Sequence, residues 1–117
     1  MHLEHILSFC QGLQGTEETF PFGERTLVFK IKGKIYALID IEQPDSINLK
    51  CDPEEAIELR ERYSSVQPGY HMNKKHWNTV LLNGELTTSQ IDQMIEKSYN
   101  LVVSSLPKKV QHELSIG

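Results

Sequence analysis

The stretch that decides the fold class is TLVFKIKGKIYALIDI, which runs from Thr26 to Ile41. In its first half the odd positions are apolar and the even positions include Lys30 and Lys32, a period of two that is typical of a strand with one buried face. Gly33 with Lys34 predicts a turn, and residues 35–41 predict a return strand with its small and branched residues on the odd positions. The stretch therefore predicts a β-hairpin within an antiparallel sheet.

The segments around this hairpin extend the pattern. Residues 46–51 predict a third strand whose alternate side chains, Ile47, Leu49 and Cys51, point to the core. Residues 1–12 have the apolar spacing of an amphipathic helix, carried by Leu3, Ile6, Leu7 and Cys10. Between them, residues 15–23 predict a loop that Phe20 and Phe22 hold to the core.

Two more helices follow. Asp52 is a good N-cap with Pro53 behind it, and Arg60 and Arg62 would complement the negative end of the helix that starts there. A β-rich run over residues 77–82 ends at a turn, and the pair Thr87 and Gln90 predicts a capping box for a last helix that reaches Pro107. The tail from residue 108 to 117 is weakly patterned and is expected to fray.

The resulting order is α-β-β-β-α-β(β)-α, with strands clustered rather than alternating with helices. This order predicts an α+β fold of two layers, an antiparallel sheet with helices packed on one face. At 117 residues the chain is long enough for one domain, so we expect residues 1–117 to form a single unit.

Composition narrows the function classes. The formal net charge is −4, which argues against nucleic-acid binding by the whole surface, so any anion site must be a local patch. Cys10 and Cys51 have no Cys-x-x-Cys spacing and are interpreted as buried, reduced thiols. With no signal peptide and no apolar run near the roughly 20 residues of a membrane span, we expect a cytoplasmic protein without a membrane partner.

The segment from Pro68 to Asn78, PGYHMNKKHWN, is the candidate contact surface. It lies inside an acid-free run from Arg62 to Gly84 and contains the only tryptophan of the chain. A segment so dense in hydrogen-bond donors and aromatic rings is either a structural clamp or a binding surface.

Several catalytic and ligand classes find no support in the linear order. There is no Gly-x-Ser-x-Gly elbow and no phosphate-binding glycine loop. The pairs His71 with His76 and His2 with His5 lack a third ligand at a zinc spacing, and two lysines between the first pair would repel a cation. We therefore expect no metal and no cofactor, and a binding protein rather than an enzyme.

Polyanion binding fits better. Lys30, Lys32 and Lys50 should project from one side of the sheet, while Lys74 and Lys75 lie on the acid-free loop. Asn73 and Asn78 can pair with base edges, Trp77 can stack on a base, and a protonated His76 can donate to phosphate. The alternative is structural: a tryptophan that anchors the core, asparagines that close turns, and lysines that solvate a sheet face.

The motifs also resemble a known family. The segments that carry the resemblance are Phe20-Pro21-Phe22-Gly23, Gly33-Lys34-Ile35-Tyr36-Ala37, Ile47-Asn48-Leu49-Lys50-Cys51, Ser98-Tyr99, Leu106-Pro107-Lys108-Lys109 and, above all, residues 68–78. In order and spacing the chain is similar to the MmcQ/YjbR family. That resemblance implies a small α+β fold with a so-called double-wing arrangement and a role in DNA binding, without catalytic residues.

The leading hypothesis is a non-enzymatic DNA-binding or regulatory module, a monomer or weak dimer. Its nucleic-acid contacts would be Lys30, Lys32, Lys50, His71, Asn73, Lys74, Lys75, His76, Trp77 and Asn78. Two alternatives stay open: a protein-interaction adaptor that never meets nucleic acid, and a small-ligand binder or enzyme that uses His71 or His76.

Overall fold

The computed structural model describes residues 3–69 and 72–116, which form ten elements of secondary structure. The strands are β1 (Thr16–Thr19), β2 (Thr26–Ile31), β3 (Lys34–Asp40), β4 (Ser46–Lys50), β5 (Val66–Pro68) and β6 (Trp77–Leu81). The helices are α1 (Leu3–Gln11), α2 (Pro53–Arg62), α3 (Thr88–Ser104) and α4 (Lys108–Ile116). The strands form one antiparallel sheet in the order β1-β2-β3-β4-β6-β5. The predicted α+β class is confirmed.

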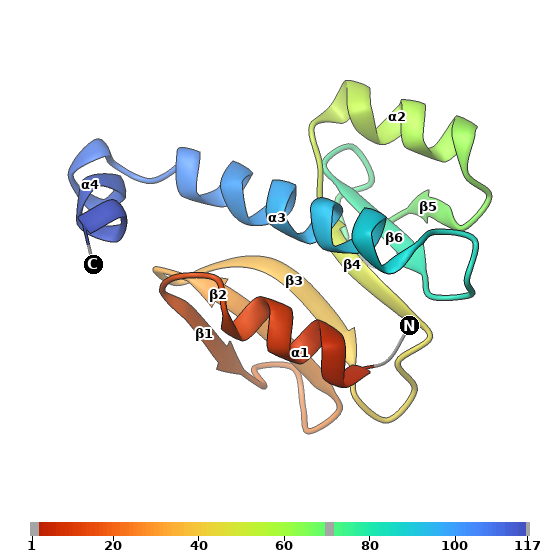
Figure 1. Cartoon of the computed structure of the whole chain (residues 1–117), viewed down its shortest axis with the longest axis horizontal. Helices are drawn as coiled ribbons and strands as arrows, with labels where there is room; N and C mark the ends of the chain where they lie inside the picture. Colours follow the sequence, from red (N-terminus) through yellow and green to blue (C-terminus); the bar gives the residue numbers. More distant parts are fainter. Residues whose placement is uncertain (1–2, 70–71, 117) are drawn as a thin grey trace.

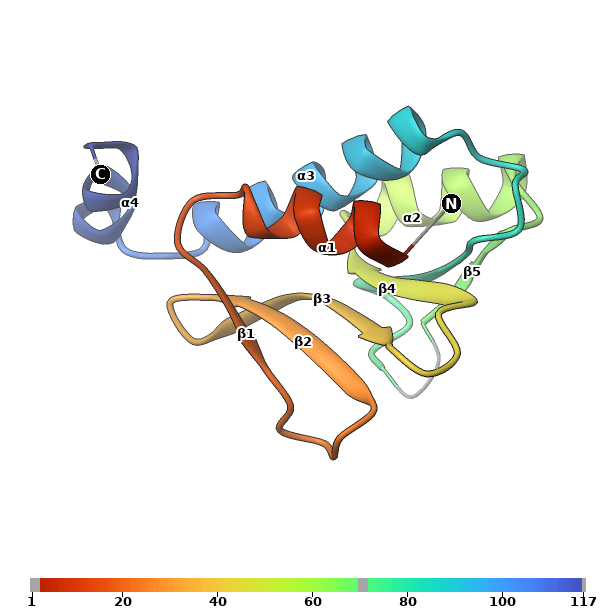
Figure 2. The ribbon, with the colours of Figure 1, turned by 60° about the horizontal axis from the view of Figure 1, so that its bottom comes forward.

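The helices lie on one side of the sheet, as Figures 1 and 2 show. Helix α3 runs across the strands with α1 beside it, and α2 lies near β5 and β6. We call the sheet face under these helices the inner face and the opposite one the outer face. The outer face carries no helix of the described chain, although Val28 and Leu38 are buried there.

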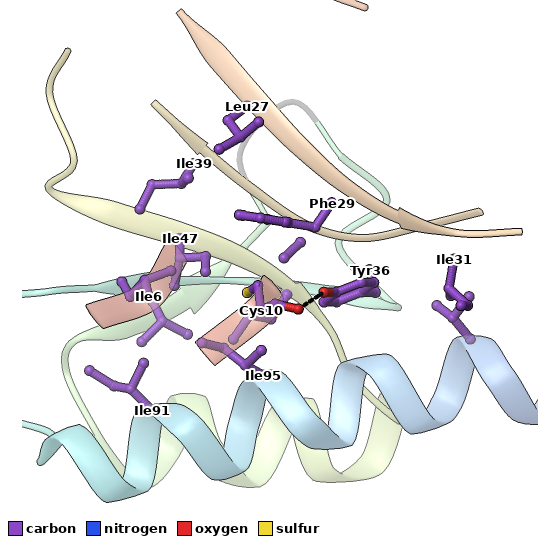
Figure 3. Close-up of a cluster of buried hydrophobic side chains, with 14 of the residues drawn as sticks. Ile6, Cys10, Leu27, Phe29, Ile31, Tyr36, Ile39, Ile47, Ile91 and Ile95 are labelled. Carbon is purple, nitrogen blue, oxygen red and sulfur yellow. Dashed lines mark hydrogen bonds between the residues drawn. The ribbon is translucent and has the colours of Figure 1, made fainter. Parts of the chain in front are cut away.

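The core fills the space between the inner face and α3 (Figure 3). The odd residues of β2, Leu27, Phe29 and Ile31, are buried there in one cluster with Ile91 and Ile95 of α3, as their alternation predicts. Helix α1 adds its apolar stripe through the buried residues Ile6 and Cys10. Burying a side chain of this size contributes about 1.5–3 kcal/mol, so these contacts fix α1 and α3 on the sheet.

One part of the hairpin departs from the period of two. The register of β2 and β3 shifts between Phe29 and Lys30, so Tyr36 joins Ala37 in the buried cluster although its even position predicted the outer face. Inserting a residue in this way re-aims the side chains that follow it. The Tyr36 hydroxyl hydrogen-bonds the Cys10 carbonyl at 3.3 Å and the Thr16 hydroxyl at 2.7 Å, which ties α1 and β1 to the sheet (Figure 3).

Ser98 of α3 completes the contact between β3 and β4. The paired registers of these strands run from Ala37 and Leu49 to Ile39 and Ile47. Next to the pair of Ala37 and Leu49, the Ser98 hydroxyl donates to the Tyr36 carbonyl at 2.5 Å and accepts from the Lys50 amide at 2.9 Å. A fully buried serine therefore supplies hydrogen bonds that the strands do not give each other.

Two sequence predictions need correction. Residues 16–19 are not a loop but the edge strand β1, and the rings meant to hold it down are exposed, Phe20 by 45% and Phe22 by 66%. The sequence TEET lacks apolar alternation because an edge strand can be held mainly by backbone pairing, here to β2. The tail from residue 108 onward is also not frayed: it forms α4, whose Val110 and Leu114 pack against the core.

The helix starts agree with their predicted caps. The Asp52 carboxylate accepts from the amides of Glu54 and Glu55, and Thr87 and Gln90 form a reciprocal capping box. Both cysteines are free, with Cys10 buried as predicted and Cys51 only half-buried. Among the described residues, every helix is too short or too polar to cross a membrane.

Candidate functional site

Arg60 of α2 anchors the loop before β6. Its Nε donates to the Asn78 Oδ1 at 2.7 Å, and its Nη2 donates to the carbonyl oxygens of Lys74 and, at 3.3 Å, Trp77. The place of Arg60 in the last turn of α2 predicted a contact with the negative end of its own helix. Instead it crosses to residues far along the chain, so one guanidinium fixes both the basic loop and the start of β6.

Further backbone contacts close the loop. The Gly69 amide donates to the Trp77 carbonyl at 2.9 Å, and a Cβ at Gly69 would lie 2.8 Å from the Trp77 Cβ, so only glycine allows this approach. The Asn73 Oδ1 accepts from the Lys75 amide at 2.9 Å, and the His76 carbonyl accepts from the Cys51 amide at 2.7 Å. The segment is thus a structural clamp in its backbone, whatever its exposed side chains bind.

Strand alternation divides the candidate residues of β6 between the two faces. In the register with β4, Trp77 lies opposite Lys50 on the outer face, whereas Asn78 lies opposite the buried Leu49 on the inner face. Asn78 is only 2% exposed and accepts from Arg60. Its amide therefore lies on the other side of the sheet from the outer-face lysines with which it was predicted to contact nucleic acid.

The predicted lysines do not all share one surface. Alternation sets Lys30 and Lys50 on the outer face, while Lys32 lies beyond the end of β2 in the turn, with a positive φ of 51°. Lys74 and Lys75 are exposed on the loop, as is Asn73, whereas His76 is half-buried. The prediction for His71 lies outside the described residues.

Carboxylates also reach the outer face. Glu17 of β1 is the cross-strand partner of Lys30. Asp40 at the end of β3 lies 2.9 Å from Arg25, and backbone N–H groups of Gln43 and Glu42, together with Arg25, lower the pKa of Asp40. Lys30 and Lys50 therefore lie at one end of this face, with Glu17 opposite Lys30, while Asp40 and Arg25 form an ion pair at the other end.

A groove crosses the outer face. It consists of two hollows of about 410 and 420 Å³ that share Ser46 and Asn48 in their walls. One hollow reaches Phe22 and Ile35, and the other reaches Lys74. The Thr79 hydroxyl donates to the Asn48 Oδ1 at 2.5 Å in the floor between strands β4 and β6. We call this feature the outer groove.

A separate cavity of about 430 Å³ opens between α2 and α3 on the inner side, and we call it the inner pocket. Its walls are mainly apolar, with Cys51 and Asn78 among the polar groups. Burial, and to a smaller extent the carboxylates of Glu55 and Asp52, raise the pKa of the Cys51 thiol to about 11. At the rim the Lys97 ammonium lies 2.9 Å from the Glu55 carboxylate, which raises the pKa of Lys97.

Sequence reasoning missed the inner pocket. Cys51 and Asn78 were considered, but as a core thiol and a base contact, and no periodicity shows that α2 and α3 diverge above β4 and β6. Arg60 was missed as a positioning residue for the same reason: a contact between residues 60 and 78 has no signature in the linear order.

Metal ligation gains no support from the described residues, where no three histidine, cysteine, aspartate or glutamate side chains converge. His5, one of the histidines weighed for this role, lies instead 2.9 Å from the Asp92 carboxylate and links α1 to α3.

Comparisons with known proteins agree on the family. The YjbR family model matches residues 11–101. The chain is 41% identical to the uncharacterized protein YbdF of Escherichia coli O157:H7 over 102 residues, 86% of this chain and 84% of the relative. It is 33% identical to the uncharacterized protein YjbR of Escherichia coli K12 over 110 residues, 93% of each chain.

Solved structures support the same grouping. The crystal structure of Deinococcus radiodurans protein DR2400, described as a DUF419 domain, has 42% sequence identity and a TM-score of 0.91, over 97% of this chain and 87% of that one. A crystal structure from Pseudomonas syringae has 33% identity and a TM-score of 0.74, over 87% of this chain and 99% of that one.

Proposed function

The chain belongs to the YjbR family, and from that premise we propose that it binds single-stranded nucleic acid in the outer groove. The observation that carries the proposal is the groove itself: two adjacent hollows on the sheet face that no helix of the described chain covers. Hollows of this size are in the range of sites that hold organic molecules. Both hollows have Ser46 and Asn48 in their walls, so a bound nucleic-acid strand can pass from one to the other.

Three lysines surround the path. Lys74 lines one hollow, Lys30 is the register partner of Ile35 in the other, and Lys50 follows Asn48 by two positions on the same strand. Their ammonium groups can neutralise phosphates on both sides of the groove. The acidic net charge of the chain makes binding depend on these local groups, so the affinity should be modest and strongly salt-dependent.

Aromatic rings stand near both ends. Trp77 lies opposite Lys50 on the outer face, and the exposed Phe22 lines the far hollow. Bases stack on such rings with little sequence preference, by about 1–3 kcal/mol each. The polar floor of Asn48 and Thr79 can meet base edges or sugars.

This arrangement favours a single strand over a duplex. Duplex readers usually insert a helix or a two-stranded ribbon into the major groove, and the helices of this fold lie behind the sheet, away from the groove. A sheet face with rings and lysines instead suits splayed bases. In this proposal the two wings implied by the family resemblance are the two halves of the sheet, β1 to β3 and β4 to β6, which lie on either side of the path.

The test is a fluorescence-anisotropy titration of a labelled oligothymidylate and a duplex of equal length, at about 50 and 200 mM salt. With three phosphates neutralised, the logarithm of the binding constant should fall against the logarithm of salt with a slope of about −2 for the single strand. The double variant Lys50→Ala, Lys74→Ala should bring that slope to about −0.7. The matched control removes the same charge from α4, through Lys108→Ala and Lys109→Ala, which lie on the exposed side of that helix.

Equal slopes and affinities for the groove variant and the α4 control would refute the proposal. Tighter binding of the duplex than of the single strand would indicate that nucleic acid contacts a surface other than the outer groove. Absence of any nucleic-acid binding, with a protein co-purifying instead, would favour the adaptor alternative.

A further inference from the structure

We infer that the inner pocket is a binding site for an uncharged, mainly apolar small molecule that carries a hydrogen-bond acceptor for the Asn78 amide. The pocket lies behind the sheet from the outer groove, and this inference does not depend on nucleic-acid binding. It follows from the size of the cavity, an unpartnered polar group in its wall, and the balance of charge around it.

The inner pocket has the size and the walls of a small-molecule site. The cavity of about 430 Å³ falls in the range of small-molecule sites, which are mostly apolar with few polar groups. The sheet and two helices form its apolar wall: Leu49 and Val80 come from the sheet, Leu59 from α2, and Met94 and Leu101 from α3. A site built between a sheet and two helices is rigid enough to select a shape.

The Asn78 amide is the unpartnered group. Arg60 has only donors, so the atom that faces its Nε at 2.7 Å must be the carbonyl oxygen of Asn78. This contact fixes the orientation of the amide and leaves Nδ2 buried, with no hydrogen-bond partner among the residues that the structure describes. A buried donor left unsatisfied is rare in native proteins, and it indicates a missing acceptor. Asn78 lines the pocket, but its Nδ2 is covered by neighbouring atoms. A ligand carbonyl or ring nitrogen that displaces a wall side chain can supply the acceptor.

The charge around the pocket argues for a neutral ligand. Lys97 is paired with Glu55 at the rim and the Asp52 carboxylate caps α2, so none of the three offers a free charge to an ionic ligand. Lys50 also borders the pocket, but strand alternation directs its side chain to the outer face. The Cys51 thiol in the wall stays protonated at neutral pH and therefore adds no negative charge. A charged molecule would lose its hydration without gaining a dedicated partner.

The probe for the test is prodan, a neutral naphthalene ketone whose emission shifts to the blue in an apolar site. We expect saturable, one-to-one binding to the full chain. Leu101→Trp should abolish it by filling the cavity from α3, where Leu101 is half-buried. If that variant fails to fold, Ser104→Trp at the exposed end of the same wall replaces it.

The acceptor assignment has its own variant. Asn78→Asp keeps an oxygen for Arg60 and removes the N–H donor, so prodan affinity should fall about three- to tenfold. The parent dimethylaminonaphthalene, which lacks the ketone, should bind both proteins equally. In an NMR spectrum of the wild-type chain, the Asn78 side-chain amide signals should shift on adding prodan and not on adding the parent compound.

Control variants on the outer face, Lys30→Ala and Lys74→Ala, should leave prodan binding unchanged. These controls show whether a negative result concerns the inner pocket or the nucleic-acid site in the outer groove. No saturable binding by the wild-type chain, or equal affinity in the cavity-filled variant, would overturn the site. An unchanged affinity in Asn78→Asp would overturn the role of the amide.

Discussion

Replacing Arg60 with alanine should both destabilise the fold and loosen the loop that carries Lys74. The guanidinium is the shared donor to the Asn78 side chain and to two loop carbonyls. Its removal leaves the Asn78 carbonyl oxygen inside the protein with no donor, since Asn78 is only 2% exposed. A buried acceptor without a partner carries the full penalty of its lost hydration.

The magnitude follows from these contacts. A hydrogen bond to a charged group contributes about 1.5–3 kcal/mol, and the bond to Asn78, at 2.7 Å and largely buried, should lie in that range. The two bonds to backbone carbonyls are nearer the surface, and water can replace the donor there, so together they should add at most about 1 kcal/mol. The expected loss is therefore about 2–4 kcal/mol, a large share of the roughly 5–15 kcal/mol of a typical domain.

The assay is urea unfolding followed by fluorescence. Trp77 is the only tryptophan and sits at the end of the loop that Arg60 holds, so its emission reports on the affected region. With a slope of about 1.5 kcal/mol per molar urea, the midpoint should fall by about 1.3–2.7 M. Arg62→Ala is the matched control: it removes the same charge two residues later on the same helix, where the arginine is exposed.

A double-mutant cycle with Asn78→Ala isolates the central bond. The loss in the double variant should be smaller than the sum of the single losses by about 1–2 kcal/mol, because either change alone breaks the same pair. If Arg60→Ala shifts the midpoint no more than Arg62→Ala, or if the cycle shows no coupling, then Arg60 is not the anchor of this loop.

Three further changes test other parts of the structure. Ser98→Ala removes the hydroxyl that bridges β3 and β4, and should lower the free energy of unfolding, measured in urea, by about 1–3 kcal/mol. Ser104→Ala on the exposed face of α3 is its control, and equal losses in the two variants would contradict the bridge. Gly69→Ala places a Cβ 2.8–2.9 Å from Trp77 atoms, so the thermal midpoint should fall and the Trp77 emission should change; an unchanged melt would contradict the close approach. Burial raises the pKa of Cys51 to about 11, so iodoacetamide should label this thiol slowly at pH 7 and about tenfold faster with each pH unit up to about pH 10. Mass spectrometry measures the labelling rate, and a rate that levels off below pH 9 would contradict the raised pKa. The folded thiol keeps its proton above the pH at which the unfolded thiol loses it, so this group's contribution to stability is complete below about pH 9 and declines toward pH 11.

The sequence predicted the parts of the fold that depend on local rules. The hairpin of residues 26–41, the cap at Asp52 and the capping box at Thr87 each follow from spacing that neighbouring residues impose. Strand β1 was missed because an edge strand can be made by backbone pairing, which leaves no alternation in TEET. The inward turn of Tyr36 was missed because a register shift interrupts the period of two without a mark in the sequence.

The site was harder to predict than the fold because its contacts join distant residues. Arg60 meets Asn78 across 18 positions, and Ser98 meets Tyr36 across 62. In both cases the chain gives the residue type but not its partner. A serine within an apolar stripe is the only local sign of the second contact, since a polar group that faces a core must find a hydrogen bond there.

The segment from Pro68 to Asn78 is where this difference matters most for function. Its density of amides, rings and lysines suggests one surface, but its last two residues begin β6, and successive residues of a strand point to opposite faces. Trp77 therefore belongs to the outer face and Asn78 to the inner pocket, although they are neighbours in sequence. Two ligands of different chemistry can then bind back to back across a single strand. Since Arg60 bonds both residues, it is the position whose loss should weaken both sites, whereas Lys74→Ala and Leu101→Trp should each affect only one.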